Sequence, residues 1–227
     1  MSERGFTLIE LMMSIAIGIT VVLGVFSLVD ISLSNSARIA ARVDANQRAR
    51  PVLQRLVDEL HSACVGPDSS PVLVGSGENT LGFKHRTGSA VSPTPDKRVV
   101  TLTGGTLSES VYPATGGTPP NWTFASSPSS TRQLLTDVGP ASAGDPPSNA
   151  PLFQYFADQA GQLGTPLPTP LSAADAGRTV HVSISFSASP RNTPVSDENA
   201  AVSVSDSAYL RFSPFSEDPT KVNGPCA

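Results

Sequence analysis

Apolar side chains form an almost unbroken run near the start of the chain, from Phe6 to Val29. These 24 residues would be about 36 Å long as an α-helix, which is enough to cross the hydrocarbon core of a bilayer. Glu10 is the one charged residue inside the run. We therefore expect a membrane-spanning helix, over residues 6–29, with a carboxylate near its N-terminal end.

After Asp30 the pattern changes from uniformly apolar to amphipathic. This predicts that the helix continues over residues 30–65 and lays its apolar face on a globular head. Pro51 has no backbone N–H, so we expect the helix to kink or divide near Ala49–Arg50. The apolar positions that recur at mostly helical spacing are Ile39, Val43, Leu53, Leu56, Val57 and Leu60, and arginines at 38, 42, 48, 50 and 55 occupy the other faces.

Residues 66–227 read as a β-rich head in which short strands alternate with clusters of Gly, Pro and Ser. Gly104-Gly105 predicts a hairpin turn, and Ala157–Gly161 predicts a second. The predicted strands are Pro71–Val74, Thr80–His85, Arg98–Thr103, Thr106–Tyr112, Gln133–Thr136, Phe153–Phe156, Val180–Phe186, and a return strand made from Ala201–Ser205 and Ala208–Phe212.

The clearest alternation runs from Val180 to Phe186, with apolar side chains on one face and His181 on the other, where we expect it to be exposed to solvent. Alternation of this kind predicts an antiparallel sheet whose apolar face is covered by the helix. The fold class is therefore α+β. Residues 87–96, 113–132 and 139–151 have no strand pattern, and we expect surface loops or poorly ordered insertions there.

Composition excludes several functions. The net charge is −4 and no basic run is long enough for a nucleic-acid tail. The histidines at 61, 85 and 181 form no metal-binding or catalytic motif with the two cysteines or the scattered carboxylates, so we expect neither a cofactor nor an enzyme. Cys64 and Cys226 are far apart, which leaves two alternatives, one long-range disulfide or two unpaired thiols.

A secretory signal peptide explains the N-terminus poorly, because the polar stub before the apolar run is very short and the run itself is too long. A plain anchor leaves Glu10 unexplained, since burying a charge in lipid is unfavourable. Cleavage after Gly5 would supply a partner: the new α-amine of Phe6 is mostly cationic at neutral pH and lies four residues before Glu10.

The stretch Arg4–Glu10, RGFTLIE, resembles the processing site of type IV prepilins and type II secretion pseudopilins. The resemblance implies that residues 1–5 are a leader, that a prepilin peptidase cuts between Gly5 and Phe6, and that it then N-methylates Phe6. It also implies that Glu10 pairs with the terminal amine of a neighbouring subunit. The partners would be the peptidase, other pilins or pseudopilins, and membrane lipid before assembly.

The stretch Asn46–Gly66 resembles the end of the long helix in PilW-like minor pilins and J-type minor pseudopilins. Together with the size of the head, that resemblance implies a minor subunit. The prepilin resemblance implies a protein of the cytoplasmic (inner) membrane, single-pass with its N-terminus inside, and Arg4 agrees with that orientation. The head would be periplasmic or extracellular and would later belong to a cell-surface filament. The alternative is an uncleaved, single-pass membrane-anchored extracellular binding domain, which the mature N-terminus would distinguish.

Overall fold

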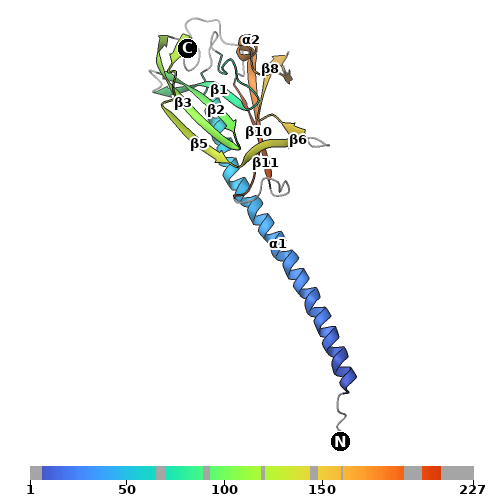
Figure 1. Cartoon of the computed structure of the whole chain (residues 1–227). Helices are drawn as coiled ribbons and strands as arrows, with labels where there is room; N and C mark the ends of the chain where they lie inside the picture. The colour runs from blue at the N-terminus through green and yellow to red at the C-terminus, as the bar shows by residue number, and fades with distance from the viewer. Residues whose placement is uncertain are drawn as a thin grey trace.

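The computed structural model describes residues 7–64, 70–88, 93–118, 121–143, 148–159, 161–191 and 201–210. One long helix, α1 (Leu8–His61), projects from a β-rich head, and the N-terminus lies at the end of the helix farthest from the head (Figure 1). The helix has 54 residues, so it is about 80 Å long. A long N-terminal helix combined with antiparallel sheets confirms the predicted α+β fold class.

α1 runs through Pro51 as a single helix, so the predicted division at Ala49–Arg50 is wrong. The physical reason is that the turns on both sides of the proline are held by packing, because Ala49 and Leu53 are both buried against the head. Proline removes one backbone hydrogen bond, and that loss is small beside the burial of an apolar face over several turns. A local bend at Pro51 stays a prediction.

The first sheet is an antiparallel meander with order β1-β2-β3-β4, and a fifth strand pairs with the first part of β3. Thr103 pairs with Thr106 across a two-residue turn in which Gly104 and Gly105 have φ of 56° and 75°, which confirms the predicted hairpin. The strands are β1 (Thr80–Gly88), β2 (Pro93–Thr103), β3 (Thr106–Thr118), β4 (Asn121–Phe124) and β5 (Ser130–Thr136).

The second sheet has order β7-β6-β10-β8-β9, with β11 paired on the other edge of β10. The predicted hairpin around Ala157–Gly161 is confirmed by the antiparallel pairing of β8 with β9. The elements are β6 (Val138–Ala143), β7 (Ser148–Ala150), β8 (Phe153–Gln159), β9 (Gln162–Pro166), the short helix α2 (Ala173–Arg178), β10 (Thr179–Ala188) and β11 (Val202–Tyr209).

The last part of α1 packs against strands of both sheets, chiefly β11 but also β10, β5 and β1. Leu56 and Leu60 from the helix share one core with Phe83 of β1 and with Ile184 and Phe186 of β10. The predicted apolar face is therefore correct from Leu53 onward. It is wrong for Ile39 and Val43, which remain exposed because the head begins to cover the helix only a few residues later.

Two predictions about strands and loops are also wrong. Pro71–Val74 is not a strand and contributes only an isolated bridge between Val72 and Phe83. The segments expected to be loops at 87–96, 113–132 and 139–151 contain parts of β1, β2, β3, β5 and β6 together with all of β4 and β7. Except in β4, where Trp122 and Phe124 alternate with exposed polar residues, their described ends are largely exposed, as in β3. The strands there are held by backbone pairing and lack the apolar alternation that reveals a strand.

His181 is buried with only 6% of its surface exposed, so the prediction of solvent exposure is wrong. His181 lies directly opposite Phe156 of β8 and Tyr209 of β11, so the three side chains share one face of the sheet. The imidazole lies between the rings of Phe156, 5.3 Å away between centroids, and Tyr209, 4.5 Å away. Aromatic neighbours from the two adjacent strands thus cover this side of β10.

Candidate functional site: the apolar N-terminal helix

Thr7 caps the N-terminus of α1. Its backbone is extended, and its hydroxyl accepts a hydrogen bond from the N–H of Glu10 at 3.4 Å, while its carbonyl accepts bonds from Glu10 and Leu11. Thr-x-x-Glu is the sequence of a capping box, in which the threonine and the glutamate each satisfy a backbone donor at the helix start. Sequence reasoning missed this role of Thr7, although the i, i+3 spacing of Thr7 and Glu10 is visible in the chain.

Glu10 lies in the first turn of α1 with its side chain exposed. Its carboxylate makes no hydrogen bond or ion pair with any residue that the structure describes, so the reciprocal half of the capping box is not formed. The helix dipole favours an anion at this position, since free backbone N–H groups give the N-terminus a partial positive charge. The carboxylate is therefore oriented by the helix and available to a group outside the subunit.

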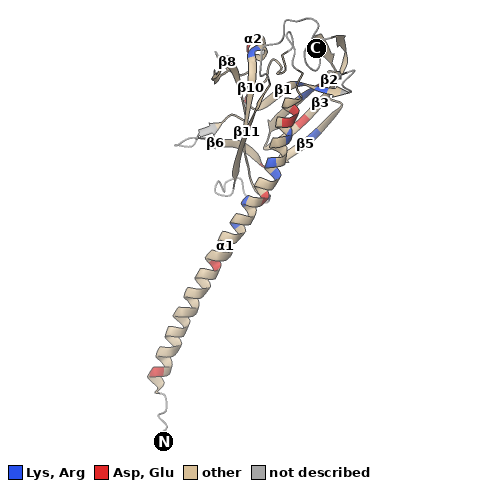
Figure 2. Ribbon diagram, turned by 180° about the vertical axis from the view of Figure 1, so that it is seen from behind, with Lys and Arg blue, Asp and Glu red and all other residues tan. Residues whose placement is uncertain are grey.

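Beyond Glu10 the helix presents an apolar surface that nothing in the subunit covers. α1 is long enough to cross a membrane and contains a stretch of 18 residues that is apolar enough to do so, and none of that stretch is buried. Figure 2 shows this part of the helix almost free of charged residues, with the charges gathered where the helix meets the head. Exposed side chains here include Leu8, Met12, Ile19, Val22, Phe26 and Leu33.

The few hydroxyls in this apolar stretch are satisfied within the helix. Ser14 donates to the carbonyl of Glu10 at 2.8 Å, Thr20 to that of Ala16 at 2.8 Å, and Ser27 to that of Leu23 at 3.0 Å. Hydrogen bonds of this kind remove the penalty of placing a hydroxyl among apolar groups. The helix can therefore lie in lipid or against other apolar helices with no unsatisfied hydroxyl at these positions.

The structure brings none of the other predicted site residues to Glu10. Gly5 and Phe6 lie outside the described residues, so cleavage and N-methylation there stay predictions. Cys64 is fully buried at the far end of α1 and is not a free thiol. Cys226 also lies outside the described residues, and its pairing with Cys64 stays a prediction.

Where α1 crosses the first sheet, a buried ionic cluster joins the helix to β2 and β3. The guanidinium of Arg98 on β2 lies 3.0 Å from both Glu59 on the helix and Glu109 on β3. Arg55, Arg132 and Asp96 complete the cluster: Arg55 bonds Glu59 at 2.7 Å, and the carboxylate of Asp96 lies 3.3 Å from Arg98. Sequence reasoning missed these residues because they are separated in the chain and form no motif.

The protonation of this cluster is set by competition between burial and its arginines. Burial together with the neighbouring carboxyl of Glu109 raises the pKa of Glu59. Burial also opposes ionisation of Glu109, but its hydrogen bonds with Glu59 and Arg132 and the charge of Arg98 prevail and lower its pKa. Glu109 is thus the carboxylate that the arginines hold in the charged form.

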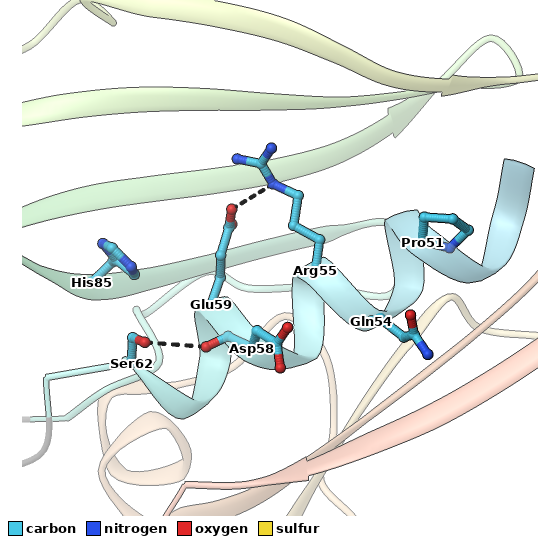
Figure 3. A pocket seen from close by; sticks show the side chains of 7 residues that line it. All are labelled: Pro51, Gln54, Arg55, Asp58, Glu59, Ser62 and His85. Carbon is cyan, nitrogen blue, oxygen red and sulfur yellow. Dashed lines mark hydrogen bonds and ion pairs between the residues drawn. The ribbon is translucent and has the colours of Figure 1, made fainter.

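An open groove of about 420 Å³ lies beside this cluster, between the end of α1 and β1 (Figure 3). Its lining mixes both signs of charge, and the hydroxyl of Ser62 donates to the carbonyl of Asp58 at 3.2 Å. Within the described ranges no group of three or more His, Cys, Asp or Glu side chains could hold a metal ion. The lining residues are Pro51, Gln54, Arg55, Asp58, Glu59, Ser62 and His85.

Comparison with known proteins finds a family match at the N-terminal region of the chain. Residues 1–26 match the family model of the prokaryotic N-terminal methylation motif, which covers the start of the apolar helix and Glu10. No curated protein matches the chain. The match and the exposed apolar helix together confirm the resemblance drawn from RGFTLIE: this chain carries the N-terminal methylation motif that is the signature of type IV pilins and pseudopilins.

Proposed function

We propose that this chain is a minor pilin or pseudopilin that enters a type IV pilus or a type II secretion-like filament through α1. In this proposal a prepilin peptidase removes residues 1–5 and N-methylates Phe6. The subunit is first held in the inner membrane by the apolar half of α1, with its N-terminus inside and its head outside. The role is structural, and the resemblance of Asn46–Gly66 to PilW-like and J-type subunits supports a minor one.

The observation that carries the proposal is the combination of the methylation motif with an uncovered helix. A membrane anchor alone needs an apolar surface, but it gains nothing from an exposed carboxylate in the first turn. In a filament the same surface packs against other helices, and the carboxylate of Glu10 meets the terminal amine of the next subunit. Pairing of these charges away from water would fix the axial position of each subunit as it joins.

Replacing Glu10 tests this function. We expect Glu10→Leu to reach the membrane normally, since the substitution removes an unfavourable charge, yet to be depleted from filaments sheared from the native host. Asp30→Asn is the matched control, because Asp30 is an exposed acid at the other end of the apolar run. It should be recovered in the sheared fraction as wild type.

The main alternative is an anchored extracellular binding domain that never polymerises. It predicts that wild-type protein stays in the membrane fraction after shearing, and that Glu10→Leu and Asp30→Asn behave alike. Recovery of both variants in equal amounts from filaments would show that Glu10 has no role in assembly.

A further inference from the structure

Residues 30–44 of α1, here called the neck, lie between the apolar run and the part of the helix that the head buries fully. The apolar run ends at Val29, and full burial against the head begins at Ala45. Ile39 lies about 15 Å beyond the end of the apolar run and Val43 about 21 Å, farther than lipid headgroups reach on a helix normal to the membrane. Their exposed fractions are nevertheless 64% and 48%.

Two arginines flank these apolar side chains. Arg38 and Arg42 are exposed and, in the part of the chain that the structure describes, neither forms an ion pair or a hydrogen bond with a side chain. The four residues Arg38, Ile39, Arg42 and Val43, here called the neck patch, stand at positions i, i+1, i+4 and i+5. Such positions form one continuous surface of a helix. The patch thus combines two available cations with two uncovered aliphatic side chains.

A neighbouring helix is the natural occupant, because the neck continues the apolar surface through which this subunit would assemble. This step rests on the proposed function. A helix packed along the apolar run and extending past Val29 would reach the neck patch within three or four turns. To satisfy the patch it must present apolar side chains with at least one carboxylate between the two arginines.

A second copy of this chain fits that requirement poorly. If the amine of Phe6 in one copy meets Glu10 of the other, the copies are displaced by about 6–10 Å, depending on how extended the first two residues are. Arg38 of one copy is then level with residues 42–44 of the other, and Arg42 is level with residues 46–48. Arg38 of one copy would therefore meet Arg42 of the other, and Arg42 would meet Arg48. Asp44 is also at the level of Arg38, but its carboxylate is already bonded to Arg48 at 3.0 Å.

We propose that the neck patch binds the α-helix of a different pilin-type subunit, one with an acidic residue at the level of Arg38 and Arg42. Like charges at this level disfavour packing of two identical copies, and an acidic partner turns the same arginines into attractive contacts. The subunit is thereby directed to a mixed assembly, as expected of a component present in few copies.

Photo-crosslinking in the native host tests this inference. A photoreactive p-benzoylphenylalanine is placed at Ile39 or Val43 of the full chain, and the adducts are identified by mass spectrometry. Ala37 is the control position, since it is exposed but lies about 160° around the helix from Ile39. We expect adducts from positions 39 and 43, and few from 37, to a second protein with its own N-terminal methylation motif.

Charge variants show whether the arginines select that partner. Arg38→Glu with Arg42→Glu should reduce the adduct by about fivefold or more, and Arg38→Gln with Arg42→Gln by less. When the acidic residue of the partner is changed to lysine, the Arg38→Glu, Arg42→Glu variant should again form the adduct. Adducts between two copies of this chain, adducts to lipid, no adducts, or yields unchanged by the charge variants would each overturn the inference.

The same samples separate this inference from the function on which it rests. A mature chain that begins at Phe6 and is recovered in sheared filaments supports the filament role whatever the adducts show. Adducts between identical copies in such a sample contradict only the mixed assembly. A chain that retains residues 1–5 contradicts the filament role itself.

Discussion

The imidazole of His181 is buried between aromatic rings, and its Nδ1 has no hydrogen-bond partner in the described structure. Burial lowers the pKa of His181 below its ordinary value of 6.5, because the charged form loses its hydration. The unfolded chain therefore binds a proton more readily than the folded chain as pH falls below about 6.5. Stability must decline in that direction.

We expect His181→Leu to weaken this pH dependence. Urea unfolding of the full chain in detergent, followed by circular dichroism at about pH 7.5 and about pH 5, should show a smaller loss of unfolding free energy for the variant than for wild type. At the higher pH the variant should be at least as stable, since an unsatisfied polar atom is removed. His61→Leu, at an exposed position, should keep the wild-type pH dependence; if His181→Leu does the same, the imidazole is not the titrating group.

Individual residues differ in how far the sequence could reveal them. Glu10 was visible because a charge inside an apolar run is rare and has a physical cost. His181 was expected to be exposed because the alternation does not reveal that Phe156 and Tyr209 stand beside it on the polar face. The local sequence gives no sign of these neighbours, which lie on strands more than twenty residues away along the chain.

At the scale of elements, Arg98 holds α1 to the first sheet by contacting Glu59 and Glu109 together. Glu109 is almost fully buried, with 2% of its side chain exposed. Removing Arg98 would leave the carboxyl groups of Glu59, Asp96 and Glu109 near one another with less compensating positive charge. Breaking a buried ion pair from one side is typically destabilising by about 3–5 kcal/mol.

We therefore expect Arg98→Ala to lower the unfolding free energy of the full chain by about 3 kcal/mol in urea titrations near neutral pH. Arg178→Ala, which removes the exposed pair with Asp175 on α2, is the matched control and should leave stability unchanged. Equal effects of the two substitutions would mean that the cluster does not hold the helix to the sheet.

The elements themselves were predictable where burial imposes a period. The helix and the strands β1, β3 and β10 have apolar faces, and their positions follow from the pattern. The start of β2, the end of β3 and all of β7 have little apolar content and are held by backbone pairing with neighbours, which no local pattern encodes. β4 has only four residues, too few for its alternation to be distinguished in the sequence. The division predicted at Pro51 is wrong for the opposite reason, since tertiary packing on both sides outweighed a local helix breaker.

At the scale of the whole molecule, the sequence predicted a long helix followed by a β-rich head, but it did not predict that the head is built from two sheets. The apolar run of residues 6–29 predicts the first half of the helix by itself. The two sheets are joined through α1 and through contacts such as the hydroxyl of Tyr155, which lies 3.0 Å from the carbonyls of Gly77 and Thr80. Such contacts arise from residues distant in sequence.

A disulfide between Cys64 and Cys226 would tie the C-terminal region to the end of α1. We expect peptide mapping under non-reducing conditions to find these two cysteines linked, and the Cys64→Ser, Cys226→Ser double variant to lose about 2–5 kcal/mol of unfolding free energy. Linkage to a cysteine of another protein, or a double variant as stable as wild type, would contradict this prediction.

The central claim is that an exposed carboxylate at the entrance to an apolar helix has its purpose after proteolysis, when a new amine is created four residues before it. The most direct measurement is the mature N-terminus of protein purified from the native host, determined by mass spectrometry of the terminal peptide. The account predicts a chain that begins at Phe6 with one methyl group on its α-amine. A chain that still carries Met1–Gly5 in cells with an active prepilin peptidase would contradict it.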